Sequence, residues 1–286
     1  MRRTPRLASI ALLALAAAAV PLAPVVGQSP SAPTMPAASF SIGDPALAAA
    51  IAATVDAGTV RTDFSVVFDG SSMIPDDTTI TGSGQTTLGL ERRMRLGVDM
   101  TAFDVGVFDV IVDGQMIYVR GLPFGDMVRP DMWLSADLAN DDPMTQTLRG
   151  LASGNNDASL LLYFLLGAPS PAELLGEETI DEVPTRHLGT TLDLDRALAL
   201  VPEEIRDTLA ANVADIRQGG VSPVLDAEVW VDAQDLVHRV RFGYALGDPM
   251  GGGTMDVTFD FRDHGAELDL GIPAPEDTVD VSSLGG

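Results

Sequence analysis

The chain has 286 residues, of which 46% are hydrophobic, so a sizeable core is available and global disorder is excluded. Its 41 acidic residues outnumber its 17 basic ones, and the net charge of −24 argues against nucleic acid and against broad attraction to an anionic membrane surface. The absence of cysteine excludes disulfides, zinc–thiolate sites and thiol catalysis.

The first 27 residues have the pattern of a secretory signal peptide. Three arginines form a basic start, the apolar run 8–20 follows, and small residues precede Gln28, where we expect cleavage. The alternative is an uncleaved amino-terminal anchor, because 8–26 approaches the minimum length of a membrane span. Residues 28–43, rich in Pro, Ser and Ala, predict a flexible tether before a domain over 44–286. The protein is therefore expected to be exported, either to the cell envelope or outside the cell.

A helix is expected at the start of the mature domain. Asp44 suits an N-cap and Pro45 suits the first turn, and apolar residues then recur at helical spacing up to Gly58.

Strands follow this helix. Alternating apolar and polar residues predict them near 60–69, 78–89, 92–101 and 107–120. Asp113-Gly114 is a two-residue hairpin signal within the last of these ranges. Such alternation leaves one face of each strand apolar and the other wet.

The middle of the chain, 123–178, is interrupted by prolines and predicts a helical insert. Leu160 to Leu166 is apolar on every side but too short to span a bilayer, so it predicts a buried helix or a cover on the sheet. Pro171 to Leu175 predicts one more helical turn.

From residue 179 the strand pattern returns, at 182–193, 227–232, 236–244 and 254–262. A short helical turn capped near Asp193 and a helix after Pro202 interrupt these strands, and the tail from Ile272 is expected to leave the sheet in an extended form. The two strand-rich regions are predicted to form one sheet, which gives a mixed α+β fold.

No pattern of a catalytic or metal site stands out. His187, His238 and His264 lack helical zinc spacing, no G-x-S-x-G turn is present, and the acids of 260–269 lack the spacing of an EF-hand loop. His187 and His238 are expected to be exposed or hydrogen-bonded strand residues. We therefore predict no catalytic residues, no metal and no cofactor, although a hydrolase with an unrecognised long-range triad stays open.

Several segments together carry a resemblance to a known family. They are Val183-Pro184-Thr185-Arg186-His187, which leads into Thr191-Leu192-Asp193-Leu194, and then Glu228-Val229-Trp230-Val231-Asp232, a turn and Leu236-Val237-His238-Arg239-Val240. With the order of elements, this pattern over roughly 44–280 resembles the LppX/LprAFG family of actinobacterial envelope lipoproteins, which is similar in fold to the carrier LolA. The resemblance implies an open, strongly curved antiparallel half-barrel with helices covering its concave face. It also implies carriage of lipids or lipidated molecules at the cell envelope. Anchored members need a cysteine after the signal segment, which this chain lacks.

The predicted function is non-enzymatic binding and transport of a lipid or another long apolar ligand, with transient membrane contact. Affinity would come from apolar area removed from water. The alternative is an envelope protein-interaction or chaperone module with a filled core and a protein partner. The residues expected to line the ligand cavity are Phe64, Val66, Phe68, Met94, Leu96, Val98, Leu162, Phe164, Val229, Val231, Met255, Val257, Phe259 and Phe261.

Overall fold

The computed structural model describes residues 44–89, 92–122, 129, 131–153, 158–168, 171–218, 220–248 and 251–284. The predicted signal peptide and tether, 1–43, lie outside these residues.

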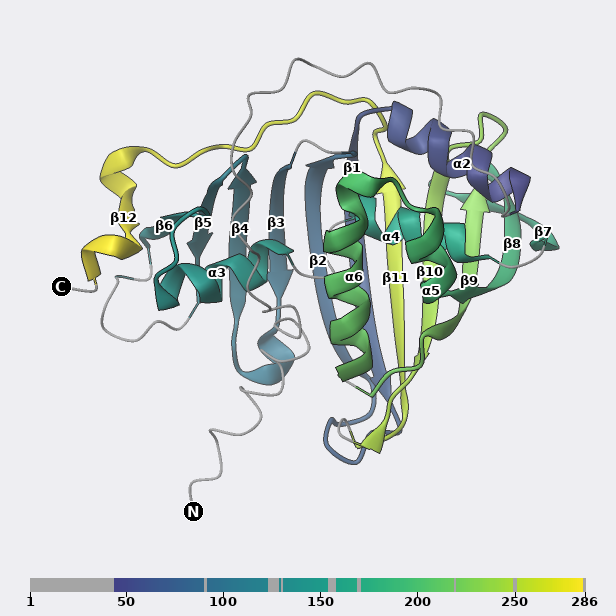
Figure 1. The fold of residues 1–286 in the computed structure, drawn as a ribbon, viewed down its shortest axis with the longest axis horizontal. Coiled ribbons are helices and arrows are strands. Elements are labelled where there is room, and N and C mark those ends of the chain that lie inside the picture. Colours follow the sequence, from purple (N-terminus) through teal and green to yellow (C-terminus); the bar gives the residue numbers. More distant parts are fainter. Residues whose placement is uncertain are drawn as a thin grey trace.

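A single twelve-stranded sheet organises the fold, in the order β12-β6-β5-β4-β3-β2-β1-β11-β10-β9-β8-β7 (Figure 1). The strands are β1 (Thr59–Asp69), β2 (Thr78–Thr87), β3 (Arg93–Asp99), β4 (Val107–Asp113), β5 (Met116–Arg120), β6 (Trp133–Asp137), β7 (Glu173–Ile180), β8 (Val183–Asp193), β9 (Val224–Val231), β10 (Val237–Ala245), β11 (Thr254–Arg262) and β12 (Thr278–Asp280). Neighbours are antiparallel except β12, which runs parallel to β6. The end strands β7 and β12 do not meet, so the sheet is an open half-barrel, as the sequence resemblance predicts.

Helices cover the concave side of this sheet. They are α2 (Pro45–Asp56), α3 (Pro143–Ser153), α4 (Ala158–Phe164), α5 (Leu194–Leu200) and α6 (Glu203–Gln218), with a short 3₁₀ turn, η3 (Leu165–Gly167), directly after α4. Figure 1 shows α3 in front of β4 and β5, while α4, α5 and α6 lie in front of β1, β11 and β10. The mixed α+β class is confirmed.

Local sequence accounts for where two of the helices begin. The Asp44 carboxylate accepts hydrogen bonds from the amides of Ala46 (2.7 Å) and Leu47 (3.1 Å), which is the N-cap arrangement predicted for α2. Asp193 caps α5 in the same way, through the amides of Asp195 and Arg196.

The structure differs from the sequence-based expectations at three places near the edges of the sheet. Pro171 to Leu175 does not form a helical turn, because β7 begins at Glu173 and its backbone pairs with β8. The insert contains β6, a strand that was not expected from the sequence pattern. The tail leaves the sheet at Ile272, as expected, but it returns as β12, which pairs with β6 and is followed by the buried Val281.

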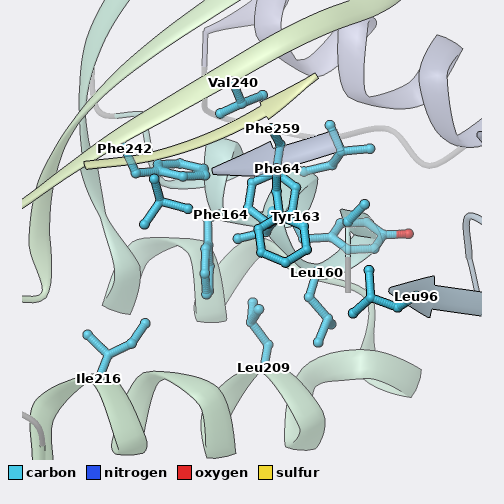
Figure 2. Close-up of a cluster of buried hydrophobic side chains, with 14 of the residues drawn as sticks. Phe64, Leu96, Leu160, Tyr163, Phe164, Leu209, Ile216, Val240, Phe242 and Phe259 are labelled. Carbon is cyan, nitrogen blue, oxygen red and sulfur yellow. The ribbon is translucent and has the colours of Figure 1, made fainter. Parts of the chain in front are cut away.

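The core lies between the concave face and the helices, in three layers. Figure 2 shows Phe64, Val240, Phe242 and Phe259 of the sheet facing α4, and side chains of α6 facing α4 from the opposite side. The α4–η3 segment is therefore enclosed on both sides, which explains why Leu160 to Leu166 is apolar all round. Each of these seven residues is at most 4% exposed, so the predicted buried helix is confirmed.

Candidate functional site

The strand register gathers apolar side chains on the concave face. Phe259 of β11 is paired with Phe64 of β1 on one side and with Val240 of β10 on the other, and all three are buried. The Phe64 and Phe259 rings stack with centroids 5.5 Å apart and planes at 25°. Phe261, two residues further along β11, continues the aromatic row at 6.5 Å from Phe259. Side chains two apart on a strand share a face, so each alternating strand adds a row to one surface.

Two glycines of β2 make room for larger neighbours on that surface. Gly82 is paired with Phe64, and a Cβ added to Gly82 would overlap the Phe64 ring. Gly84 is paired with Leu96 of β3, and a Cβ there would overlap the Arg95 carbonyl oxygen and lie 3.1 Å from Leu96 Cδ1. The absence of side chains at these positions lets neighbouring side chains lie flat against the sheet.

The α4 helix fills the space in front of this face. Phe164 of α4 packs edge-on against Phe242 of β10, with centroids 6.5 Å apart and planes at 82°. Leu162 and Phe164 are at most 1% exposed. The far end of the segment is held tightly, because Gly167 of η3 lies so close to Asp193 that an added Cβ would overlap the Asp193 carbonyl oxygen.

The structure brings all fourteen predicted lining residues into one hydrophobic cluster. Twelve of them are buried, while Val66 and Met255 are half-buried and pack against the cluster. Whether a ligand lies among these side chains stays a prediction. The strand patterns did not show that the space in front of these residues is filled. The side chains pack on one another and on α4, rather than facing an open cavity lined by strands alone.

Sequence reasoning also missed one polar residue in this layer, Asn212 of α6. It is 3% exposed and lies on the same helix face as Leu209 and Ile216, three residues before it and four after it. Its Nδ2 donates to the Thr208 carbonyl at 3.0 Å, whereas its Oδ1 is buried without a hydrogen-bond partner among the described residues. A lone Asn within an apolar helical stripe was the signal in the sequence that could have singled it out.

The opposite, convex face carries charged side chains paired across strands. Its ion pairs include Arg239–Asp260 at 2.5 Å, Arg241–Asp256 at 3.0 Å, Arg120–Asp109 at 2.5 Å and Arg93–Asp113 at 2.9 Å. These residues alternate along the strands with the buried ones, so the wet face predicted from the alternation is confirmed. Pairs of this kind on a surface each contribute about 0–1 kcal/mol.

His187 ties the edge strand β7 to this convex face. Its Nδ1 lies 3.0 Å from Glu178 Oε1 of β7, and its Nε2 lies 3.1 Å from Glu228 Oε2 of β9. The imidazole stacks on Trp230 with centroids 4.1 Å apart. The Trp230 indole N–H donates to Glu178 at 2.9 Å, and this hydrogen bond holds the pKa of Glu178 below its usual value.

His238 and His264 form a second polar cluster, beside the turn between β9 and β10. His238 Nε2 lies 2.9 Å from Asp232 Oδ2, and the His264 ring is 5.2 Å from the His238 ring. Burial raises the pKa of Asp232, but hydrogen bonds from His238 and the Leu236 amide outweigh this effect and leave it below its usual value. Burial lowers the pKa of His264. The expectation that His187 and His238 are hydrogen-bonded strand residues is confirmed.

Two other kinds of site do not occur among the described residues. In this part of the chain, no three His, Asp or Glu side chains are grouped so that they could hold a metal ion. None of the helices within it has the length and apolar character needed to cross a membrane.

Comparison with known proteins gives matches among solved structures alone. The sequence matches no family model and no curated protein. In structure, the chain is similar to the lipoprotein LppX of Mycobacterium tuberculosis, with 15% identity and a TM-score of 0.44 over 80% of this chain and 100% of that one. It is also similar to LprF from Mycobacterium bovis, with 13% identity and a TM-score of 0.43 over 82% and 99% of the two chains.

A third similar structure is the LolA superfamily protein NE2245 from Nitrosomonas europaea. It has 11% identity and a TM-score of 0.27 over 81% of this chain and 96% of that one. These three structures include proteins of the kinds that the sequence resembles, LppX and a LolA-like protein. At these sequence identities the similarity concerns the fold alone, and it does not indicate a shared ligand.

Proposed function

We propose that this protein binds a lipid or another long apolar molecule between the concave face of its sheet and its helices, and carries it at the cell envelope. The observation that carries the proposal is the three-layer arrangement, in which the short apolar segment α4–η3 lies between the sheet and α6. Displacement of this short segment would expose a continuous apolar surface, whereas charged side chains cover the other side of the sheet.

A bound apolar ligand can offset the cost of such an exchange. Moving α4 aside exposes apolar side chains, and an acyl chain laid in its place removes a comparable area from water at about 25 cal/mol per Å². The methionines around the sheet, Met94 and Met255 among them, tolerate repacking because their unbranched side chains have several rotatable bonds. Export to the envelope is proposed on the basic and apolar pattern of the first 27 residues.

The decisive experiment is organic extraction and mass spectrometry of the protein purified from its native host without detergent. A lipid recovered at about one per chain supports the proposal and names the ligand class. A blank result, followed by failure to take up dioleoylglycerol from vesicles, overturns it.

Photolabelling then locates the ligand. Dioleoylglycerol with a diazirine in one acyl chain is loaded, irradiated and mapped by peptide sequencing. Labels on the concave strands β1, β3 and β11 or on α4 and α6 are expected. Labels confined to the convex face would show that the lipid only adheres to the surface.

A second function has one observation in its favour, which is the close packing of the predicted lining residues on α4. A filled core of this kind suits an interaction or chaperone module at the envelope. Recovery of a stoichiometric protein partner together with a blank lipid extract would favour this function over the carrier.

A further inference from the structure

The most unusual group in the core is a buried acceptor with nothing to accept. Asn212 Oδ1 has no hydrogen-bond partner among the described residues, and the whole residue is 3% exposed. Buried polar atoms are nearly always paired, because leaving one unpaired costs its full hydration free energy. An orphaned acceptor at the inner face of a covering helix therefore calls for a reason.

The orientation of the amide is fixed by its other half. Nδ2 lies 3.0 Å from the Thr208 carbonyl, to which it can donate. Rotating the amide by half a turn would set Oδ1 against that carbonyl, oxygen to oxygen, and would be repulsive. The unpaired atom is thus the oxygen, and its missing partner is a hydrogen-bond donor.

Asn212 belongs to the face of α6 that points toward the layer where the ligand is proposed to lie. Leu209 and Ile216 lie on the same face of α6, and Figure 2 shows both pointing toward the layer that contains Leu160 and Phe164. Asn212 falls between them in sequence at one-turn spacing, and it shares their burial.

The charge around this layer restricts the donor to an uncharged group. No arginine is among the buried residues of the described chain, and the buried acids Asp44 and Asp232 are engaged by helix-cap and histidine hydrogen bonds. A phosphate or carboxylate placed beside Asn212 would have no cation to pair with, and burying an unpaired charge is prohibitive.

We propose that Asn212 is a specificity residue of the ligand site and accepts a hydrogen bond from a hydroxyl or amide N–H on an uncharged lipid. The inference rests on the proposed carrier function and adds to it the chemical class of the ligand. It also implies a trade between stability and binding, because the free protein bears the cost of the unpaired oxygen and the bound ligand relieves it.

A matched pair of lipids tests the inference directly. The full chain is incubated with phosphatidylcholine vesicles that contain either dioleoylglycerol, with its free hydroxyl, or its O-methyl ether, which lacks the donor. Recovered lipid is quantified by mass spectrometry after the vesicles are removed by flotation. We expect the unmodified protein to retain the alcohol about tenfold better than the ether, since the ether leaves the acceptor unpaired.

Two variants test whether the preference for the alcohol depends on the Asn212 amide. Asn212→Leu is expected to bring the ratio close to one by weakening retention of the alcohol, and to raise the melting temperature of the lipid-free protein. Ile216→Val, which removes one methylene from the same helix face, is expected to preserve the ratio.

The outcomes separate the two proposals. If neither lipid is retained by the unmodified protein, the carrier function fails and this inference fails with it. If both are retained equally, the carrier function stands and the inference is overturned without any variant. A preference for the alcohol that Asn212→Leu leaves unchanged would assign the donor contact to another residue, and would also overturn the inference.

Discussion

The ring of Phe64 on β1 occupies the space that a side chain at position 82 of β2 would need. The two residues are paired across the strands, and a Cβ added to Gly82 would overlap the ring and lie 2.7 Å from the Gly97 carbonyl oxygen. Phe64 is 4% exposed and stacked on Phe259, so it has little freedom to move aside.

Gly82→Ala is therefore expected to lower the free energy of unfolding by about 2 kcal/mol, the usual cost of overpacking a core. Urea denaturation measures the effect. Gly97→Ala is the matched control, because Gly97 lies on the neighbouring strand and its added Cβ would meet the Asp109 carboxylate at an ordinary 3.5 Å. Equal effects of the two substitutions would mean that the contact with the Phe64 ring is unimportant.

Thr54 docks helix α2 onto the sheet through one buried hydroxyl. Its Oγ1 donates to the Ala50 carbonyl at 2.7 Å and accepts from the Val237 amide at 2.9 Å, and the residue is fully buried. Thr54→Val keeps the shape but leaves the Val237 N–H unpaired, so we expect a loss of about 1–3 kcal/mol. Thr54→Ser keeps the hydroxyl and should cost less than the valine variant. If serine proves the more harmful, the methyl group rather than the hydrogen bond holds the helix.

Gly167 sets how closely the α4–η3 segment approaches the start of α5. An added Cβ would overlap the Asp193 carbonyl oxygen, which belongs to the backbone and cannot rotate away. Gly167→Ala is expected to cost about 1–3 kcal/mol and lower the melting temperature. Gly176→Ala serves as a control, since a Cβ on this edge-strand residue meets no atom within 4 Å. An unchanged melting temperature for Gly167→Ala would mean that η3 shifts without cost.

Acidification is expected to destabilise the protein in part through His264. Burial lowers the pKa of this imidazole in the folded chain, where its Nε2 faces the Val237 carbonyl and its ring faces His238, with Asp232 and Asp263 nearby. The unfolded chain therefore binds a proton more readily than the folded chain. The stability contributed by neutral His264 is complete above about pH 6.5 and declines as the pH falls below it.

Thermal melts between neutral and mildly acidic pH measure this contribution. His264→Gln cannot take up the proton, so its melting temperature should fall less over that range than that of the unmodified protein. Identical slopes for the two proteins would rule out His264 as a source of the pH dependence.

The sequence predicted those strands that have one buried and one wet face. In β1, β3 and β11 the alternation follows directly from the sheet, since residues two apart share a face. The strand β6 escaped prediction because Trp133, Leu134, Ser135 and Ala136 are all buried, which removes the alternation. The edge strand β7 is exposed along nearly its whole length, so its conformation comes from pairing with β8 rather than from any apolar pattern of its own.

The sequence was enough to predict which residues belong to the candidate site, but not how the sheet, α4 and α6 are stacked around it. Period-two spacing is enough to place Phe259 and Phe261 on one face of their strand, and Phe64 and Phe68 on one face of theirs. That α4 would lie against this face, with α6 behind it, depends on contacts between segments far apart in the chain. A helix that is apolar all round is predicted to be buried on all sides, but its sequence does not say which elements bury it.

The pairing of β1 with β11 has a consequence for how the chain folds. Phe64 and Phe259 are neighbours in the sheet but 195 positions apart in the chain (259 − 64), so one side of β1 stays unpaired until the last quarter of the protein has been made. Contacts of such long separation close slowly, because the entropy of a long loop is lost before the contact forms. Until then the first six strands carry an open edge at β1, and the molecule becomes a single sheet only once β11 has paired with it.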